Sequence, residues 1–306
     1  MNKLIIISGP TGVGKSQLSI ELAKMLDGEI ISCDSMQIYR HMDIGTAKIK
    51  SDEMDGITHH MIDIIDPSES FSVKEYKIMA EEIIQEIYNR NKIPIMVGGT
   101  GLYINSIIYG LDLDSNNSNE DIKKELYNKL DKYGIQYIRS EIKRVDPLSY
   151  DRIHENDIKR NIRALEYYLC TGKAFSLREN QFRKDNSKYN WNLYALIRDR
   201  KHLYDIINRR VDIMLKNGLL DELKGILALG VDPNAQSMQA IGYSELIKYL
   251  NNEWDYEFAV EKIKQHSRNY AKRQLTWFRN DPNAKFIDIE ENEINDILNM
   301  IRREND

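Results

Sequence analysis

The chain has few cysteines, and the two that it has form no motif. Cys33 and Cys170 lie far apart in its 306 residues and in no C-x-x-C pattern. Disulfide frameworks and structural zinc sites both need clustered cysteines, so we expect two reduced thiols and neither kind of site. The pair His59-His60 has no cysteine or carboxylate at ligand spacing, which favours a structural or substrate-positioning role over a metal site.

Long hydrophobic runs and a strong net charge are also missing. The apolar run near the N-terminus is too short for a signal peptide or a membrane span, so we expect a cytoplasmic protein with no membrane partner. The formal net charge of −5 argues against nonspecific binding of nucleic acid by overall charge. With no internal repeat, the length suits one large or two modest domains. A monomer is expected.

A glycine-rich segment matches the phosphate-binding pattern GxxxxGK[ST]. Its backbone amides can curl around phosphate oxygens, its lysine can reach the outer phosphate, and its last hydroxyl can ligate magnesium. An expected strand at 4–8 precedes it and an expected helix at 15–26 follows it, which places the loop at a positive helix end. The pattern most often indicates a nucleoside triphosphate, and a glycine-rich turn without a ligand is the less favoured reading. The residues are Gly9, Pro10, Thr11, Gly12, Val13, Gly14, Lys15 and Ser16.

The order of strand and helix patterns predicts the fold. Strands at 4–8, 29–32 and 93–97 alternate with helices at 15–26 and 73–90, which is typical of an α/β protein with a parallel sheet. Residues 122–171 show only helical periodicity between two polar stretches. A strand at 191–197 and helices at 203–216, 219–229 and 257–278 then follow. We predict a P-loop NTPase-like core, 1–111 and 192–306, interrupted by an all-helical insertion domain at 112–191.

Asp34 comes directly after the expected strand at 29–32. In open α/β sheets, ligands bind beyond the carboxyl ends of the strands, so Asp34 should face the same crevice as Lys15. A carboxylate there can accept a proton from a nucleophile or hold magnesium through water. An aspartate that only caps a helix or a turn is equally consistent with its position.

Two further residues are candidates for phosphate contacts. Thr100 lies in the segment Gly98-Gly99-Thr100-Gly101 at another strand end, where its hydroxyl could touch a phosphate, although such glycine-rich segments are commonly plain turns. Arg210 could clamp a phosphate with both arms of its guanidinium, or it could be solvated at the surface.

Basic residues gather in two stretches. Residues 262–279 contain six cations and no acid, with Tyr270, Trp277 and Phe278 among them. Cations interleaved with aromatics suit an RNA backbone with splayed bases, while a solvated basic face is the alternative. The second cluster is Lys159, Arg160, Asn161, Ile162 and Arg163. Two separated patches favour an extended polyanion.

The ordered set of segments 9–16, 34–39, 43–48, 97–103 and 272–279 resembles the tRNA dimethylallyltransferase family, also called the tRNA isopentenyltransferases, nearly from end to end. The resemblance implies transfer of a dimethylallyl group from dimethylallyl diphosphate to the exocyclic amine of the adenosine immediately 3′ of the tRNA anticodon. The products would be isopentenyl-adenosine and diphosphate. It also implies that the phosphate loop holds a diphosphate with Mg²⁺ rather than ATP, and that the helical insertion contacts the anticodon stem-loop.

The resemblance also implies roles for single residues. Asp34 would be the general base on the adenine amine, and Thr100 would contact the bridging oxygen of the leaving diphosphate. Lys15, the loop amides, Ser16 through magnesium, and Arg210 would neutralise that diphosphate. The flipped-out base would be contacted by Ser35, Met36 and Gln37.

Contacts with tRNA are implied for both basic stretches. They would involve the cluster at 159–163, Lys123 where the family commonly has arginine, and Lys272, Arg273, Gln274, Trp277 and Arg279. The chain departs from the family pattern at Ile206, where an arginine is usual one turn before Arg210. It also shows no C-terminal zinc finger of the eukaryotic kind, which indicates a bacterial-type enzyme.

Two other functions fit parts of the sequence. A small-molecule P-loop kinase would use ATP with Asp34 as its base, but it needs no basic aromatic helix near the C-terminus. A nucleotide-switched RNA-binding protein would need residues 262–279 but neither Asp34 nor Thr100. The identity of the bound phosphate compound separates the three.

Overall fold

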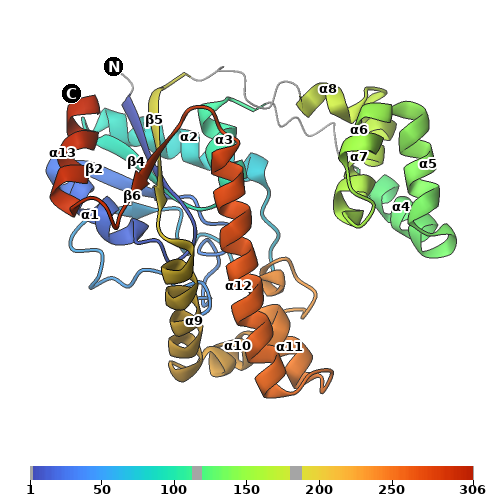
Figure 1. The fold of residues 1–306 in the computed structure, drawn as a ribbon. Coiled ribbons are helices and arrows are strands. Elements are labelled where there is room, and N and C mark those ends of the chain that lie inside the picture. Colours follow the sequence, from blue (N-terminus) through green and yellow to red (C-terminus); the bar gives the residue numbers. More distant parts are fainter. Residues whose placement is uncertain (1–2, 112–118, 180–187, 306) are drawn as a thin grey trace. The chain divides into compact units, whose positions relative to one another are not determined.

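The computed structural model describes residues 3–111, 119–179 and 188–305. The chain forms two compact units, one built from Met1–Ile108 with Ser187–Asp306 and the other from Tyr109–Asn186 (Figure 1). The two polar stretches that suggested the limits of the insertion lie largely outside the described residues. No helix within the described ranges is long and apolar enough to cross a membrane.

The larger unit is built on a parallel sheet, as predicted. Its strands are β1 (Lys3–Ser8), β2 (Gly28–Ser32), β3 (His59–His60), β4 (Ile93–Gly98), β5 (Asn190–Ile197) and β6 (Ala284–Asp288). They lie in the order β3-β2-β4-β1-β5-β6, and every pair is parallel. Residues 4–7 of the central strand β1 are fully buried, since helices cover both faces of such sheets and favour continuous apolar runs. β5 begins at Asn190, before the expected limit of the insertion at 191.

Helices of the larger unit cover the sheet and extend beyond it. They are α1 (Lys15–Leu26), α2 (Val73–Asn89), α3 (Gly101–Ile108), α9 (Arg200–Lys216), α10 (Leu219–Ala228), α11 (Tyr243–Leu250), α12 (Tyr256–Arg279) and α13 (Ile294–Asn305), with a 3₁₀ turn at Ser237–Gln239. α2 begins at the predicted capping box of Ser72 and Glu75. Figure 1 shows α9 and α12 side by side beyond the carboxyl ends of the strands, with α10 and α11 at their far end.

The smaller unit is helical throughout its described part. It comprises α4 (Glu120–Tyr133), α5 (Ile135–Val145), α6 (Pro147–Arg152), α7 (Ile158–Thr171) and α8 (Phe175–Glu179). Its own apolar core includes Leu126, Ile138, Ile142 and Leu165. A separate core of this kind is what a distinct folding unit requires.

The strand order brings three loops together. β2, β4 and β1 are neighbours, so the segments that follow them leave the sheet side by side. The pairing even continues past the strands, because Cys33 N donates to Val97 O (2.7 Å) and Thr100 N donates to Cys33 O (3.0 Å). Residues 9–16, Asp34 and Thr100 therefore lie at one edge of the sheet, where parallel α/β proteins bind their ligands.

Helix α12 closes tightly over this edge because Gly99 has no side chain. A Cβ atom at Gly99 would lie 2.0 Å from Nε2 of Gln274 on α12. Gly99→Ala should therefore push the helix away and lower the free energy of unfolding by about 1–3 kcal/mol. Urea denaturation measures this change.

Gly225→Ala is the matched control. Gly225 lies within α10, and a Cβ atom there would meet no heavy atom within 4 Å among the described residues outside the helix's own backbone. Alanine should therefore raise the free energy of unfolding by about 0.5–1 kcal/mol. Equal denaturation midpoints for the two variants would contradict the close approach of α12.

Candidate active site

The phosphate loop joins β1 to α1, as its pattern predicts. Gly14 precedes the helix with a φ of 108°, in the left-handed region that favours glycine. Lys15 turns back over the loop, and its Nζ donates to the carbonyl oxygens of Gly9 (3.0 Å) and Pro10 (2.8 Å). Ser16 is exposed in the first turn of α1. The loop thus presents backbone amides, an ammonium and a hydroxyl at one helix end, a suitable arrangement for phosphate.

Lys15, Asp34 and Arg210 act on one another electrostatically. Burial lowers the pKa of Lys15 to about 8; the Asp34 carboxylate opposes this shift and Arg210 adds to it. Burial also lowers the pKa of Arg210, again opposed by Asp34. Two cations held this close favour an additional anion. The arginine is therefore part of the same site and not a solvated surface residue.

Asp34 forms the turn bond that its position suggested, and it also lies in the site. One carboxylate oxygen, Oδ1, accepts from Met36 N (2.9 Å). The next residue is tied to the neighbouring strand end, since Ser35 N donates to Oγ1 of Thr100 (3.1 Å). These bonds fix the carboxylate of Asp34 and the hydroxyl of Thr100 relative to each other.

Arg210 reaches the phosphate loop from α9. Its Nη1 donates to Oγ1 of Thr11 at 3.4 Å. One turn earlier on α9, Cγ2 of Ile206 lies 3.4 Å from where a Cβ of Gly12 would be. The position that departs from the family pattern therefore faces the loop with an apolar group.

Gln274, which was predicted to contact tRNA, makes hydrogen bonds inside the protein. Its side chain is 6% exposed; Oε1 accepts from Thr11 N (2.9 Å) and Nε2 donates to Gly99 O (3.1 Å). Its amide is thus bonded within the protein, and the contact of this residue with tRNA stays a prediction. Trp277 packs its ring against Gly101, where a Cβ would lie 2.1 Å from Nε1.

Two members of the second basic cluster are also buried. Asn161 is fully buried and donates to the carbonyl oxygens of His154 and Asp157 (both 2.9 Å), and Ile162 belongs to the core of the helical unit. Their side chains point inward, and the contact of these two residues with tRNA stays a prediction. Lys159 and Arg160 are exposed, while Arg163 pairs with Glu166 (2.8 Å).

The remaining cations predicted to meet tRNA lie at the surface or at the cavity. Lys272, Arg273 and Arg279 are exposed, and the guanidinium of Arg273 lies over the Tyr270 ring, 5.5 Å from its centre. Lys123 is half-buried and pairs with Glu120 within α4 (3.0 Å).

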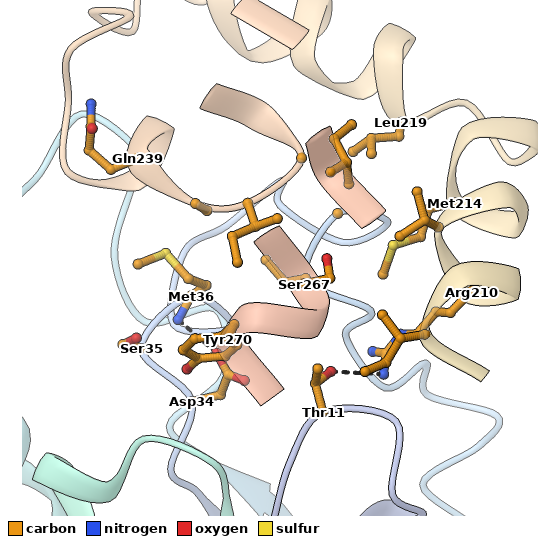
Figure 2. Close-up of a pocket in the computed structure, with 18 of the residues that line it drawn as sticks. Thr11, Asp34, Ser35, Met36, Arg210, Met214, Leu219, Gln239, Ser267 and Tyr270 are labelled. Atoms are coloured by element: carbon orange, nitrogen blue, oxygen red, sulfur yellow. Dashed lines mark hydrogen bonds between the residues drawn. The ribbon is translucent and has the colours of Figure 1, made fainter. Parts of the chain in front are cut away.

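A cavity of about 270 Å³ opens beside these groups. Figure 2 shows Asp34, Tyr270, Thr11 and Arg210 at one end, and Met214 and Leu219 at the other. Burial and the nearby Asp34 carboxylate raise the pKa of Tyr270 to about 12, against the effect of hydrogen bonding to Thr100. One end of the cavity is polar and the other is apolar, which suits a ligand that has one polar end and one apolar end.

Sequence reasoning missed much of this lining. Ile207, Val211 and Met214 on α9, and Ile263, Ser267 and Tyr270 on α12, all line the cavity. They recur at helical spacing of three or four residues, a signal that could have marked both inner faces. Residues from the 239–242 segment have no such periodicity.

No cluster of three His, Cys, Asp or Glu suited to a metal occurs among the residues that the structure describes. Mg²⁺ bound with a phosphate substrate usually takes only one or two protein ligands and keeps several waters. The exposed hydroxyl of Ser16 next to the loop amides, with the Asp34 carboxylate in the same site, fits that mode of binding.

Comparison with known proteins gives a consistent family. Residues 37–281 match the family model described as IPP transferase. The chain is 47% identical over 302 residues to the tRNA dimethylallyltransferase of Clostridioides difficile strain 630, covering 97% of this chain and 96% of the relative. It is 48% identical over 279 residues to that of Thermoanaerobacter sp. strain X514, covering 90% and 89%.

Two solved structures of transferases that act on tRNA are also similar to this chain. The full-length tRNA isopentenylpyrophosphate transferase of Bacillus halodurans matches with a TM-score of 0.74 at 44% identity, covering 99% of this chain and 96% of that one. A eukaryotic dimethylallyltransferase captured acting on tRNA matches with a TM-score of 0.77 at 31% identity, covering 94% and 73%.

The lowered pKa of Lys15 predicts how anion binding depends on pH. The charged ammonium attracts an anion, so binding of inorganic diphosphate raises the pKa of Lys15 above its free value of about 8. Diphosphate should bind the wild type more tightly than Lys15→Ala near neutral pH. Above the free pKa this advantage should fall about tenfold per pH unit, until the pKa of the complex is reached.

Isothermal titration at a series of pH values measures the two dissociation constants. Diphosphate ionises in the same way in both titrations, so the effect of its ionisation cancels in the ratio of the two dissociation constants. A ratio that stays constant across the alkaline range would show that the charge of Lys15 does not contribute to binding.

Proposed function

Because this chain belongs to the IPP transferase family, we propose that it is a tRNA dimethylallyltransferase that modifies the adenosine immediately 3′ of the anticodon. The donor is dimethylallyl diphosphate, and the acceptor is the exocyclic amine of that adenosine. The observation that carries the proposal is that Asp34 and Arg210 line the polar end of one cavity and that both act electrostatically on Lys15 of the adjoining phosphate loop. Such a site can hold a diphosphate and place a base beside it.

The phosphate loop and the two cations stabilise the leaving diphosphate. Negative charge grows on its bridging oxygen as the carbon–oxygen bond breaks, and fixed amides and cations stabilise that charge most in the transition state. Lys15 and Arg210 are half-buried, so solvent screens this effect less than it would at the open surface. The hydroxyl of Thr100 accepts from Ser35 N and can donate its own hydrogen to the bridging oxygen.

Asp34 serves as the general base. The lone pair of an adenine amine is delocalised into the ring, so the amine is a poor nucleophile until its proton is removed. As the new carbon–nitrogen bond forms, the proton passes to the carboxylate and the electron pair of the breaking bond leaves with the diphosphate. General base catalysis of this kind contributes about 10²–10⁴-fold.

The base must leave its stack to reach Asp34, and this costs least in an RNA loop. We assign the contacts with the flipped base to Ser35, Met36 and Gln37, which follow Asp34 in the chain; the first two line the cavity. Exposed Lys272, Arg273 and Arg279 on α12, together with Lys159 and Arg160 of the helical unit, supply the positive charge that holds the anticodon stem-loop.

Enzymes that transfer groups from diphosphates typically use a divalent metal, and Mg²⁺ is the ion we propose here. When bound, it neutralises charge on the diphosphate, and Ser16 would hold it. We further propose that the enzyme acts as a monomer in the cytoplasm, where its tRNA substrate is found. The relatives favour this function over an ATP-dependent kinase or a nucleotide-switched RNA-binding protein.

Asp34→Asn tests the assignment of the base. The substitution keeps the size of the side chain and an oxygen that can accept from Met36 N, but it removes the proton acceptor. We expect kcat for prenyl transfer to fall about 10²–10⁴-fold with tRNA affinity unchanged. Product nucleosides are measured by mass spectrometry and affinity by filter binding. An equal loss of tRNA binding would mean that Asp34 positions the base and does not take its proton.

Lys272→Ala and Arg273→Ala test the tRNA surface. Each should weaken tRNA binding and make the slope of log affinity against log salt shallower by about one unit. Lys285→Ala is the control, since Lys285 lies on the outermost strand β6 and pairs with Glu304 of α13 (2.6 Å). Slopes identical to wild type in the first two variants would place their side chains away from the RNA.

A further inference from the structure

The segment 43–46, here called the wall loop, forms part of the cavity that contains Asp34. Gly45 and Thr46 line the cavity directly. The loop belongs to no helix or strand, so its shape depends on bonds to other parts of the chain. Those bonds come from α10, from α11 and from the segment that follows Asp34.

A single carboxylate holds the backbone of the wall loop. Oε2 of Glu222, in the first turn of α10, accepts from the amides of Asp43 (2.9 Å) and Ile44 (2.7 Å). Oε1 of Glu222 accepts from the amide of Gly45 (3.0 Å) and from the hydroxyl of Tyr243 (2.5 Å). Bonds from neutral donors to an ionised carboxylate are shorter and stronger than bonds between neutral groups. Four of them converge here.

The ring of Tyr243 holds the same loop from another side. Tyr243 begins α11 and is fully buried. A Cβ atom at Gly45 would lie 2.4 Å from its ring, so the glycine allows the ring to pack directly on the loop backbone. Glu222 and Tyr243 therefore act as one clasp on Gly45.

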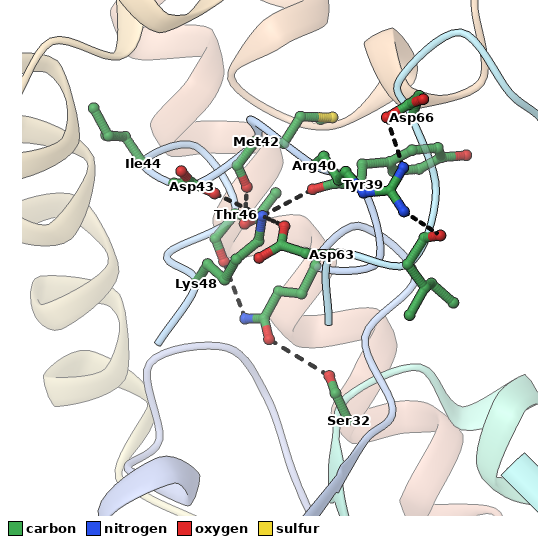
Figure 3. A network of polar contacts seen from close by, with 12 residues as sticks. Ser32, Tyr39, Arg40, Met42, Asp43, Ile44, Thr46, Lys48, Asp63 and Asp66 are labelled. Carbon is green, nitrogen blue, oxygen red and sulfur yellow. Dashed lines mark hydrogen bonds and ion pairs between the residues drawn. The ribbon is translucent and has the colours of Figure 1, made fainter. Parts of the chain in front are cut away.

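The far side of the wall loop is tied to the segment that carries Asp34. Nε2 of Gln37 faces the carbonyl oxygens of Thr46 (3.3 Å) and Ala47 (3.5 Å). The buried ammonium of Lys48 donates to Tyr39 O (2.8 Å) and pairs with Asp43 (2.6 Å) and Asp63 (2.5 Å) (Figure 3). The wall loop thus connects α10 to residues 34–39 through bonds on both of its sides.

From this arrangement we propose that Glu222 is a positioning residue for the acceptor side of the reaction. It fixes the wall loop and, through Gln37, the place where the target base meets Asp34. The inference rests on the proposed function and deepens it. Every hydrogen bond of Glu222 given above goes to the wall loop or to Tyr243, and none goes to residues 9–16 or Arg210. Its loss should therefore harm the use of tRNA and leave the binding of diphosphate intact.

Glu222→Gln is the primary test. Glutamine keeps the shape of the side chain but replaces one acceptor oxygen by a donor nitrogen, which cannot satisfy the amide N–H groups on that side. With tRNA as the varied substrate, kcat/KM should fall about ten- to a hundredfold. The dissociation constant of inorganic diphosphate with Mg²⁺ should stay within about twofold of wild type.

Tyr243→Phe is a gentler second variant. It removes only the hydroxyl that donates to Oε1 and keeps the packed ring, so the same kcat/KM should fall about two- to tenfold. This variant tests the clasp even if Glu222→Gln folds poorly.

Asp221→Asn is the matched control. It removes the same charge from the same turn of α10, but its side chain is exposed and Asp221 has no part in the clasp. Its kcat/KM for tRNA should equal that of the wild type.

The outcomes separate the two claims. If Glu222→Gln behaves like Asp221→Asn, or if it loses diphosphate binding in proportion to its loss of activity, Glu222 has no selective positioning role and the inference is wrong. If the wild type itself transfers nothing to tRNA, the proposed function fails and the inference fails with it.

Discussion

The side-chain amide of Gln274 joins three segments that are far apart in the sequence. It accepts from Thr11 N in the phosphate loop and donates to Gly99 O after β4, while its own helix, α12, carries Tyr270 and Arg273 to the cavity. A buried amide with both ends bonded is stable only where both partners are in place, because an unsatisfied polar group in the interior costs about 1–3 kcal/mol. The close approach that this requires explains the glycines after β4. The geometry of the site therefore depends on one helix meeting two strand ends at short distance.

That geometry concentrates charge where the substrate needs it. Lys15 and Arg210 lie near each other, and burial lowers the pKa of both. Such an arrangement is unfavourable for the protein alone and becomes favourable when a diphosphate arrives, which suits a site that must stabilise a leaving anion. Asp34 acts electrostatically on both cations. In the proposed reaction the wall loop, held by Glu222, completes the acceptor side, so different sets of bonds position the donor and the acceptor.

Local patterns predicted the central strands, the phosphate loop, α2 with its capping box, and the change to a purely helical unit. Burial within a basic helix was harder to predict. Composition marked residues 262–279 as cationic but did not distinguish their faces, and Gln274 was grouped with the RNA-facing residues. Yet Ala271, Gln274 and Phe278 are all buried on α12 at spacings of three and four, so periodicity places the glutamine on the inner face. The burial of Asn161 and Ile162 in the second basic cluster was not predicted for the same reason. α11 and β6 are short, so tertiary packing contributes most to their formation. α13 buries Ile297, Leu298 and Ile301 at helical spacing, a pattern from which it could have been predicted. The clasp of Glu222 joins residues about 180 positions apart, and no local pattern signals such a contact.

The central claim is that the phosphate loop holds a prenyl diphosphate and that the cavity delivers the prenyl group to tRNA. The most direct measurement incubates the purified protein with Mg²⁺, dimethylallyl diphosphate and an unmodified tRNA that has adenosine 3′ of its anticodon, in the absence of ATP. Mass spectrometry of the digested tRNA and an assay of released diphosphate then follow the reaction. The account predicts isopentenyl-adenosine at that one position, with one diphosphate released for each nucleoside formed. An unchanged tRNA, or a product that forms only when ATP is added, would contradict it.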